Sequence, residues 1–228
     1  MNSKELGKIP KTKIENISLK RKAYLVTMLP NIPSSVEYTE KIKKYWNAVD
    51  LQISQLESKA GVVKKILIEG IIGQGDDAEL MLEQSTPQAL SLIKTRRSSG
   101  AILESYEDKE LFEKLFDLGR CLQMGLVNKE IADLLTNKYK DISEKRHQHL
   151  IRTLDETVDE GEALLLIGSD LQSVIPDDME KFFVSPPELD EVTRWIRDQQ
   201  ANQNTAEDSN QPEDDSEDQK DSKLWTPN

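Results

Sequence analysis

The apolar run EALLLIGS at residues 162–169 constrains the fold of this chain more than any other segment. Leucine and isoleucine fill successive positions, so both faces of a strand formed here are apolar. Strands buried on both faces are typical of parallel sheets that are covered by helices on each side. The run therefore predicts a central strand, with Leu164 and Leu166 facing one side and Leu165 and Ile167 the other.

Four further segments have the apolar content of strands. They are 23–29, 63–69, 101–105 and, more weakly, 182–184. Helical patterns alternate with these segments, and two of them are long, at 34–59 and 128–158, the second with a possible break near Tyr139. We therefore predict an α/β domain over residues 22–200, with a mostly parallel sheet of four or five strands covered by helices.

Apolar residues in the first long helix recur at 4-3-4-3 spacing. They are Ile42, Trp46, Val49, Ile53 and Leu56. This spacing is that of a coiled-coil seam, but it covers only two heptads. Packing on the sheet of the same domain is therefore favoured over a coiled-coil dimer.

The two ends of the chain differ in charge. The first 22 residues hold seven lysines and arginines against two acids, and we expect residues 1–21 to form a basic, partly disordered leader. Residues 201–228 hold eight acids and two lysines and predict a disordered acidic tail. Near its end, Leu224 and Trp225 are candidates for docking on a protein partner. The alternative is a terminus that only keeps the protein in solution.

Composition narrows the classes of function. The net charge of −12 disfavours binding to nucleic acid, because an acidic surface repels phosphates. No apolar run approaches the ~20 residues of a membrane span, and the N-terminus lacks the apolar core of a secretory signal. Cys121 is the only cysteine, which fits a reducing cytoplasm, and we expect it to be a packed thiol.

Ligands of parallel sheets bind at the carboxyl ends of the strands. The residues that follow the predicted strands are Pro30, Glu69, Gly70, Glu104, Glu107, Asp108, Gly168, Ser169 and Asp170. Acids at three strand ends could hold magnesium or calcium, since both cations prefer oxygen ligands. The alternative is that these acids simply meet solvent at the strand ends.

Other patterns that suggest chemistry are weak. The glycines at 70, 73 and 75 lack the spacing of a phosphate-binding loop and indicate a flexible turn. His147 and His149 lie two residues apart on a helix, so they point in different directions and cannot share a metal ion.

The segment RHQHLIRTLDETVDEGEALLLIGSDLQSVIPDDME resembles the last conserved block of TraB-like proteins, a group that includes ChaN-like and Tiki-like members. Arg146 matches the arginine of that block, Gly168 its glycine, and Pro176-Asp177 its turn. KKILIEGI resembles the second strand of the family, with Glu69 at the acidic position, and GAILESYED resembles a later strand that ends in an acid, here Glu107 or Asp108. The resemblance covers about residues 22–198.

Three departures from the family pattern bear on activity. Pro30 and Leu171 stand where the family has histidines, and His147 stands where it has an aspartate. Histidines at these places would be metal ligands or proton carriers, which proline and leucine cannot be. The resemblance therefore implies a catalytically inactive interaction or regulatory protein. We expect no cofactor apart from a possible divalent cation.

The pocket implied by this reading is lined by Pro30, Gly70, Gly168, Ser169 and Leu171. The alternative function is a divalent-metal-dependent hydrolase. Its candidate residues are Glu69, Glu104, Arg146 and Asp170. The oligomeric state is left open.

Overall fold

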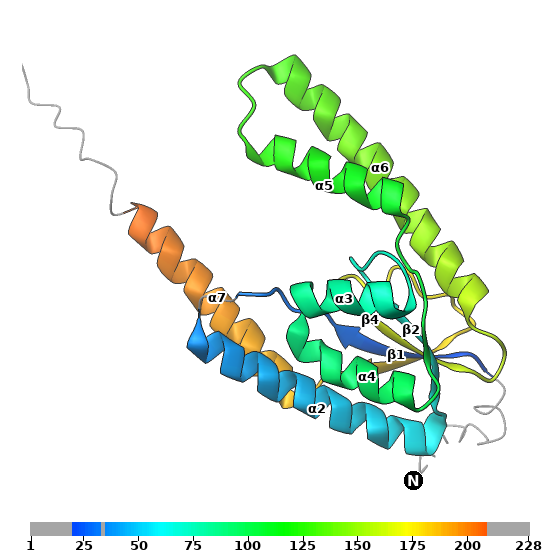
Figure 1. The fold of residues 1–228 in the computed structure, drawn as a ribbon. Helices are drawn as coiled ribbons and strands as arrows, with labels where there is room; N and C mark the ends of the chain where they lie inside the picture. The colour runs from blue at the N-terminus through cyan, green and yellow to red at the C-terminus, as the bar shows by residue number, and fades with distance from the viewer. Residues whose placement is uncertain (1–19, 33–34, 209–228) are drawn as a thin grey trace, which may run out of the picture. The chain divides into compact units, whose positions relative to one another are not determined.

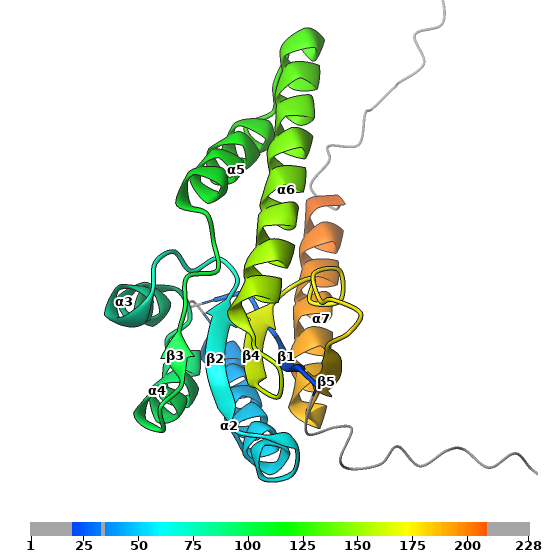
Figure 2. The same ribbon diagram turned by 90° about the vertical axis from the view of Figure 1, so that its right-hand side faces the viewer.

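The computed structural model describes residues 20–32 and 35–208, with side chains up to residue 202. A five-stranded sheet lies at its centre (Figure 1). The strands are β1 (Lys22–Thr27), β2 (Val63–Ile68), β3 (Ile102–Leu103), β4 (Ala163–Gly168) and β5 (Glu180–Val184). Their order is β3-β2-β4-β1-β5, and every neighbouring pair is parallel (Figure 2). The prediction of an α/β fold with a parallel sheet is confirmed.

Helices connect β1 to β2, β2 to β3 and β3 to β4, and a last helix follows β5. They are α2 (Val36–Ala60), α3 (Gly75–Ser85), α4 (Leu90–Ser98), α5 (Lys109–Gln123), α6 (Lys129–Thr157) and α7 (Pro187–Asp208), with a short 3-10 turn, η1 (Pro87–Ala89), before α4. The chain divides into two compact units after Val192. The first contains the sheet and the helices through α6, and the second begins within α7.

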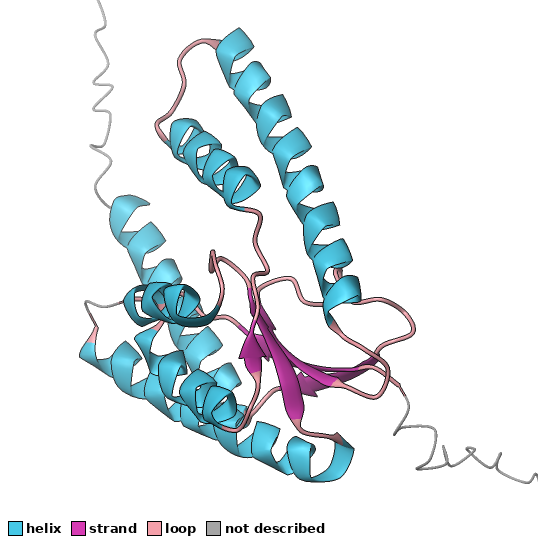
Figure 3. Cartoon of the chain, turned by 45° about the vertical axis from the view of Figure 1, so that its right-hand side comes forward, coloured by secondary structure: helices cyan, strands magenta, loops and turns pink. Residues whose placement is uncertain are grey.

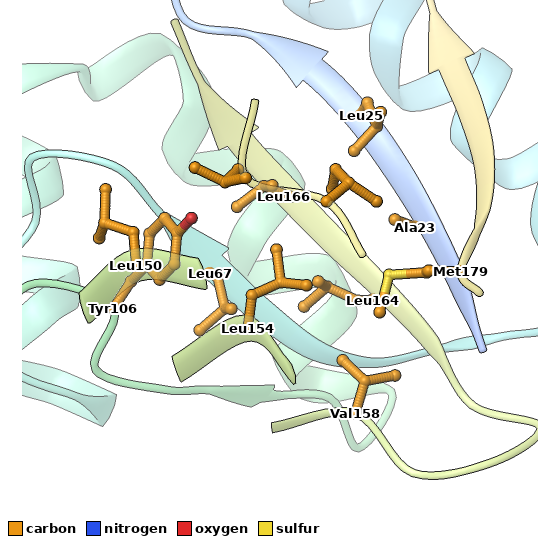
Figure 4. Close-up of a cluster of buried hydrophobic side chains, with 12 residues drawn as sticks. Ala23, Leu25, Leu67, Tyr106, Leu150, Leu154, Val158, Leu164, Leu166 and Met179 are labelled. Carbon is orange, nitrogen blue, oxygen red and sulfur yellow. The ribbon is translucent and has the colours of Figure 1, made fainter. Parts of the chain in front are cut away.

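The two faces of the sheet have different covers (Figure 3). On one face, Leu164 and Leu166 of β4 pack in a cluster with Leu150 and Leu154 of α6 (Figure 4). On the opposite side lie α2 and α4 (Figure 1). All four leucine and isoleucine side chains of β4 from 164 to 167 are fully buried, which confirms β4 as the central strand.

The seam of the first long helix packs within the domain, as predicted. Four of its members, Ile42, Trp46, Val49 and Ile53, are buried in α2. The helix is tied to the sheet by its aromatic residues as well, because the hydroxyl of Tyr45 donates a hydrogen bond to the carbonyl of Thr27 at the end of β1.

Side chains cap three of the helices at their N-termini. The hydroxyl of Ser35 accepts from the backbone N–H of Tyr38, Asp108 caps α5, and Asn128 caps α6. Each cap satisfies a backbone donor that has no partner inside its helix. The two long helices, α2 and α6, begin close to their predicted starts at residues 34 and 128.

Some boundaries differ from the predictions. Helix α6 is continuous through Tyr139, since residues 129–157 contain no glycine or proline to interrupt it. Helix α7 runs to Asp208, so the first residues of the predicted tail are helical, because extending an existing helix is far easier than starting one. Leu224 and Trp225 lie outside the described residues.

At the other end of the chain, the last residue of the predicted leader belongs to the fold. Arg21 donates hydrogen bonds to Asp155 and Asp178, which fixes the entry into β1. Lys20 is also described, and residues 1–19 of the leader lie outside the described part. Among the described residues, no helix combines the length and apolar character that a membrane span requires.

Candidate strand-end site

Glu69 and Ser169 meet because β2 and β4 are neighbours in the sheet. Glu69 follows β2, and its backbone N–H donates to the carbonyl of Ile167 at 2.8 Å. Ser169 follows β4, and its backbone N–H and hydroxyl donate to Oε2 of Glu69 at 2.6 and 2.8 Å. One carboxylate oxygen of Glu69 is therefore engaged by two donors from the neighbouring strand end.

Gly168 makes this approach possible. A β-carbon at this position would lie 2.8 Å from Oε2 of Glu69 and 3.0 Å from Cδ2 of Leu171. The first distance is shorter than real contacts of a β-carbon and the second is tighter than most, so a side chain at Gly168 would displace Glu69. The glycine is thus required by the packing of the carboxylate.

Arg146 on α6 joins Glu69 to a second carboxylate, that of Glu107. Its Nη2 donates to Oε1 of Glu69 at 3.1 Å and also to Oε1 of Glu107. Its Nε donates to Oε2 of Glu107 at 2.9 Å. The pairing with Glu107 is bidentate, a geometry that gives strong and directional ion pairs.

Backbone and aromatic groups complete the surroundings of Glu107. The N–H of Gly70 donates to its Oε1 at 2.8 Å, and the side chain of Glu107 is fully buried. The guanidinium of Arg146 lies 5.9 Å from the centre of the Phe112 ring, within range of a cation–π contact. The hydroxyl of Tyr106 is buried here without a hydrogen-bond partner among the described residues.

The charges of this cluster shift its pKa values. Burial tends to raise the pKa of Glu69, but the hydrogen bonds from Ser169 and the ion pair with Arg146 outweigh burial and lower it. Burial likewise tends to lower the pKa of Arg146, and the two carboxylates raise it above its ordinary value. Burial and then the negative charges of Glu69 and Glu107 raise the pKa of Tyr106. Glu69 and Arg146 are therefore both ionised at neutral pH.

Two cavities adjoin the network. The larger, about 590 Å³, lies toward α5, and the smaller, about 260 Å³, lies toward the residues after β4. Glu69, Arg146 and Ser169 line both cavities. The wall of the larger cavity is mainly apolar. It includes Met28, Phe112, Leu115, Phe116 and Tyr139.

The structure brings together most of the predicted site residues. Glu69, Gly70, Gly168, Ser169 and Arg146 surround the network, and Gly70 lines the larger cavity. Gly168 lines the smaller one, together with two further predicted residues, Asp170 and Leu171. The carboxylate of Glu69 links the ends of β2 and β4.

Two predicted residues lie elsewhere. Glu104 accepts from Nζ of Lys65 at 2.6 Å and lines neither cavity. Pro30 is exposed, and its carbonyl accepts a hydrogen bond from the hydroxyl of Tyr38. At the end of β1 it is Met28, not Pro30, that lines the larger cavity.

Metal-ligating side chains are separated in the described part of the chain. No group of three or more histidine, cysteine or acidic side chains there is arranged to hold a metal ion. His147 lines the smaller cavity, and Nε2 of His149 lies 3.3 Å from the hydroxyl of Thr153. Cys121 is exposed on α5 rather than packed, because α5, described over its whole length, has no buried residue.

Comparison with known proteins identifies no relative of this chain. No protein-family model, curated protein or solved structure matches the chain. A functional assignment therefore depends on the geometry of the site and on the sequence resemblance.

Proposed function

We propose that this chain is a non-catalytic, TraB-like interaction or regulatory protein of the cytoplasm, whose strand-end site binds a ligand without transforming it. One observation carries the proposal. Both carboxylates of the site, those of Glu69 and Glu107, are engaged by Arg146 and by backbone N–H groups.

The positions singled out by the TraB-like resemblance support the family part of the proposal. Arg146 contacts Glu69 across 77 sequence positions and Glu107 across 39. Gly168, also a matched position, leaves room for Glu69. The resemblance thus singles out residues that lie in mutual contact, and this supports the family part of the proposal.

The charge state of Glu69 argues against acid–base catalysis. A general base is most effective when its pKa lies near the working pH. The pKa of Glu69 lies below the ordinary value for a glutamate, so this carboxylate is a weak base and is already occupied by donors. A hydrolase would need to break these contacts before Glu69 could bind a metal ion or a water molecule.

The larger cavity indicates the kind of ligand. Its volume of about 590 Å³ falls within the range of roughly 300–1,000 Å³ that is usual for small-molecule sites. An apolar wall from α5 faces the polar groups of Glu69, Arg146 and Ser169. This combination suits a compound with an apolar body and one group that can form hydrogen bonds.

Catalysis is tested by assaying the full chain and its Glu69→Gln variant for hydrolysis of peptides and esters, with and without magnesium, manganese or zinc. We expect no metal-dependent turnover by either protein. A metal-dependent hydrolysis that Glu69→Gln abolishes would overturn the proposal and favour the hydrolase.

Binding is tested with the fluorescent probe 8-anilinonaphthalene-1-sulfonate, which combines apolar rings with one polar group. Phe112→Ser removes a ring from the cavity wall and should weaken probe binding. Leu51→Ser removes an exposed apolar side chain of α2 outside both cavities and is the matched control. Equal loss in both variants would show that the cavity is not the binding site.

A further inference from the structure

Helix α5 and the first part of α6 form a helical arm, defined here as residues 109–141. The arm leaves the sheet after β3 and extends beyond the strand ends before α6 returns over β4 (Figures 1 and 2). Helix α5 is amphipathic, with apolar residues at 111, 112, 115, 118 and 122. It packs mainly against α6, yet none of its residues, all of which the structure describes, is buried.

Large apolar side chains are exposed along this arm and at its end. They are Phe116, Met124, Val127, Ile131 and Leu134. These five are among the eleven large apolar side chains exposed in the described residues, and the other six are scattered over α2, α3 and the strands and loops. Ile131 and Leu134 are three residues apart on α6 and so share one face of the helix.

The charge of the arm is unlike that of the rest of the chain. Residues 109–141 hold six lysines and arginines and six acids, so their net charge is zero, whereas the whole chain carries −12. Both helices of the arm contain equal numbers of positive and negative residues, three of each. Two copies of the arm can therefore approach without the repulsion that the acidic remainder would cause.

We propose that the arm is a self-association surface, on which the arm of a second copy of this chain packs about a two-fold axis. Two helical hairpins that meet by their apolar faces make a four-helix bundle. A two-fold arrangement places the same surface, with both signs of charge, on the two sides of the interface, so acidic residues of one copy can face cationic residues of the other. An anionic membrane fits less well, since the arm has no excess of lysine and arginine.

The size of the arm sets the strength of the interaction. A standard protein interface involves about 20–30 residues on each side, more than one face of this arm offers. We therefore expect a weak dimer, with a dissociation constant of the order of micromolar. The expected complex is thus visible only over a range of protein concentrations.

The test is sedimentation velocity on the full chain at about 1–100 µM, a range that brackets a micromolar dissociation constant. We expect a reversible dimer, and Ile131→Glu with Leu134→Glu should raise the dissociation constant by about tenfold or more, since charge buried at an interface is costly. Leu51→Glu on α2 is the control, because Leu51 and Leu134 are both 63 % exposed. Circular dichroism confirms that each variant is folded.

A spin label on Cys121, the only cysteine of the chain, gives a readout independent of the charged variants. Cys121 is exposed on α5, so a dimer through the arm should show dipolar coupling between two labels, which the double variant should lose. A chain that stays monomeric up to 100 µM overturns the proposal. So does a dimer that survives the double variant, or one that Leu51→Glu dissociates equally.

Neither Ile131 nor Leu134 lines the strand-end cavities. Failure of the self-association proposal would therefore leave the proposed function of the strand-end site unaffected, and the two can be distinguished.

Discussion

The guanidinium of Arg146 binds the carboxylate of Glu107 through two of its nitrogens, Nε and Nη2. The side chain of Glu107 is completely buried, since none of its surface is accessible to solvent. A buried carboxylate is costly unless it is paired and hydrogen-bonded. The pair thus fixes α6 over the end of β3 and holds the candidate site together.

Replacement of Arg146 by methionine should destabilise the protein by about 3–5 kcal/mol, because it leaves the carboxylates of Glu107 and Glu69 without their cation. Urea denaturation measures the change. Arg152→Met is the matched control, since Arg152 is exposed on the same helix, and its effect should stay within about ±0.5 kcal/mol. Adding Glu107→Gln to Arg146→Met should recover part of the loss. Equal effects of Arg146→Met and Arg152→Met would contradict the role given to the pair.

Glu69 should make the free energy of unfolding depend on pH. Its pKa is lower in the folded protein than in an unfolded chain, so its contribution is fully present above the unfolded pKa of about 4.3. That contribution is lost as the pH falls through the lower, folded pKa, since protonation then removes the charge that Arg146 and Ser169 bind. Unfolding measured between neutral pH and pH 3 should show the stability advantage of the wild type over Glu69→Gln shrinking in acid. A difference that stays constant over this range would rule out this linkage.

Two glycine-to-alanine substitutions should have opposite effects. In Gly168→Ala the new β-carbon would lie 2.8 Å from Oε2 of Glu69, and we expect a loss of about 1–3 kcal/mol from overpacking. In Gly119→Ala the nearest atom, Cε2 of Tyr139, is 3.7 Å away, an ordinary contact. Since Gly119 lies inside α5, alanine there should stabilise by roughly 0.5–1 kcal/mol. Thermal denaturation shows whether each variant is more or less stable than the wild type. A Gly168→Ala variant as stable as the wild type would refute the tight packing of Glu69.

The parts of the fold that local patterns determine could be predicted from the sequence. Strand β4 is apolar on both faces, and the caps Asp108 and Asn128 stand directly before helical patterns. The end of α7 could not be placed, because Ala201 to Asp208 are polar and typical of disorder, yet they continue a helix that is already formed.

In the site, the main difference between prediction and structure arises at the shortest strand. Strand β3 contains two residues, Ile102 and Leu103, too few for alternation to show which following acid turns toward the ligand side. Glu104 pairs with Lys65 on the neighbouring strand, and Glu107, three residues on, reaches Arg146. The position of Asp108 as helix cap is the one local signal that could have favoured Glu107, since it fixes the backbone there.

Strand β4 lies at the centre of the sheet, so its buried side chains should contribute strongly to stability. Leu166 is fully buried and packs in a cluster with Leu150 and Leu154 of α6 (Figure 4). Leu166→Ala should cost about 2–5 kcal/mol, because the substitution loses the burial of the side chain and leaves a cavity that flanking strands cannot fill. Leu51→Ala, at an exposed leucine of α2, is the control and should change stability by about 0.5 kcal/mol at most. Urea denaturation compares the two variants. A cost below about 1 kcal/mol for Leu166→Ala would mean that the interior relaxes around β4, which is incompatible with a strand clamped between β2 and β1.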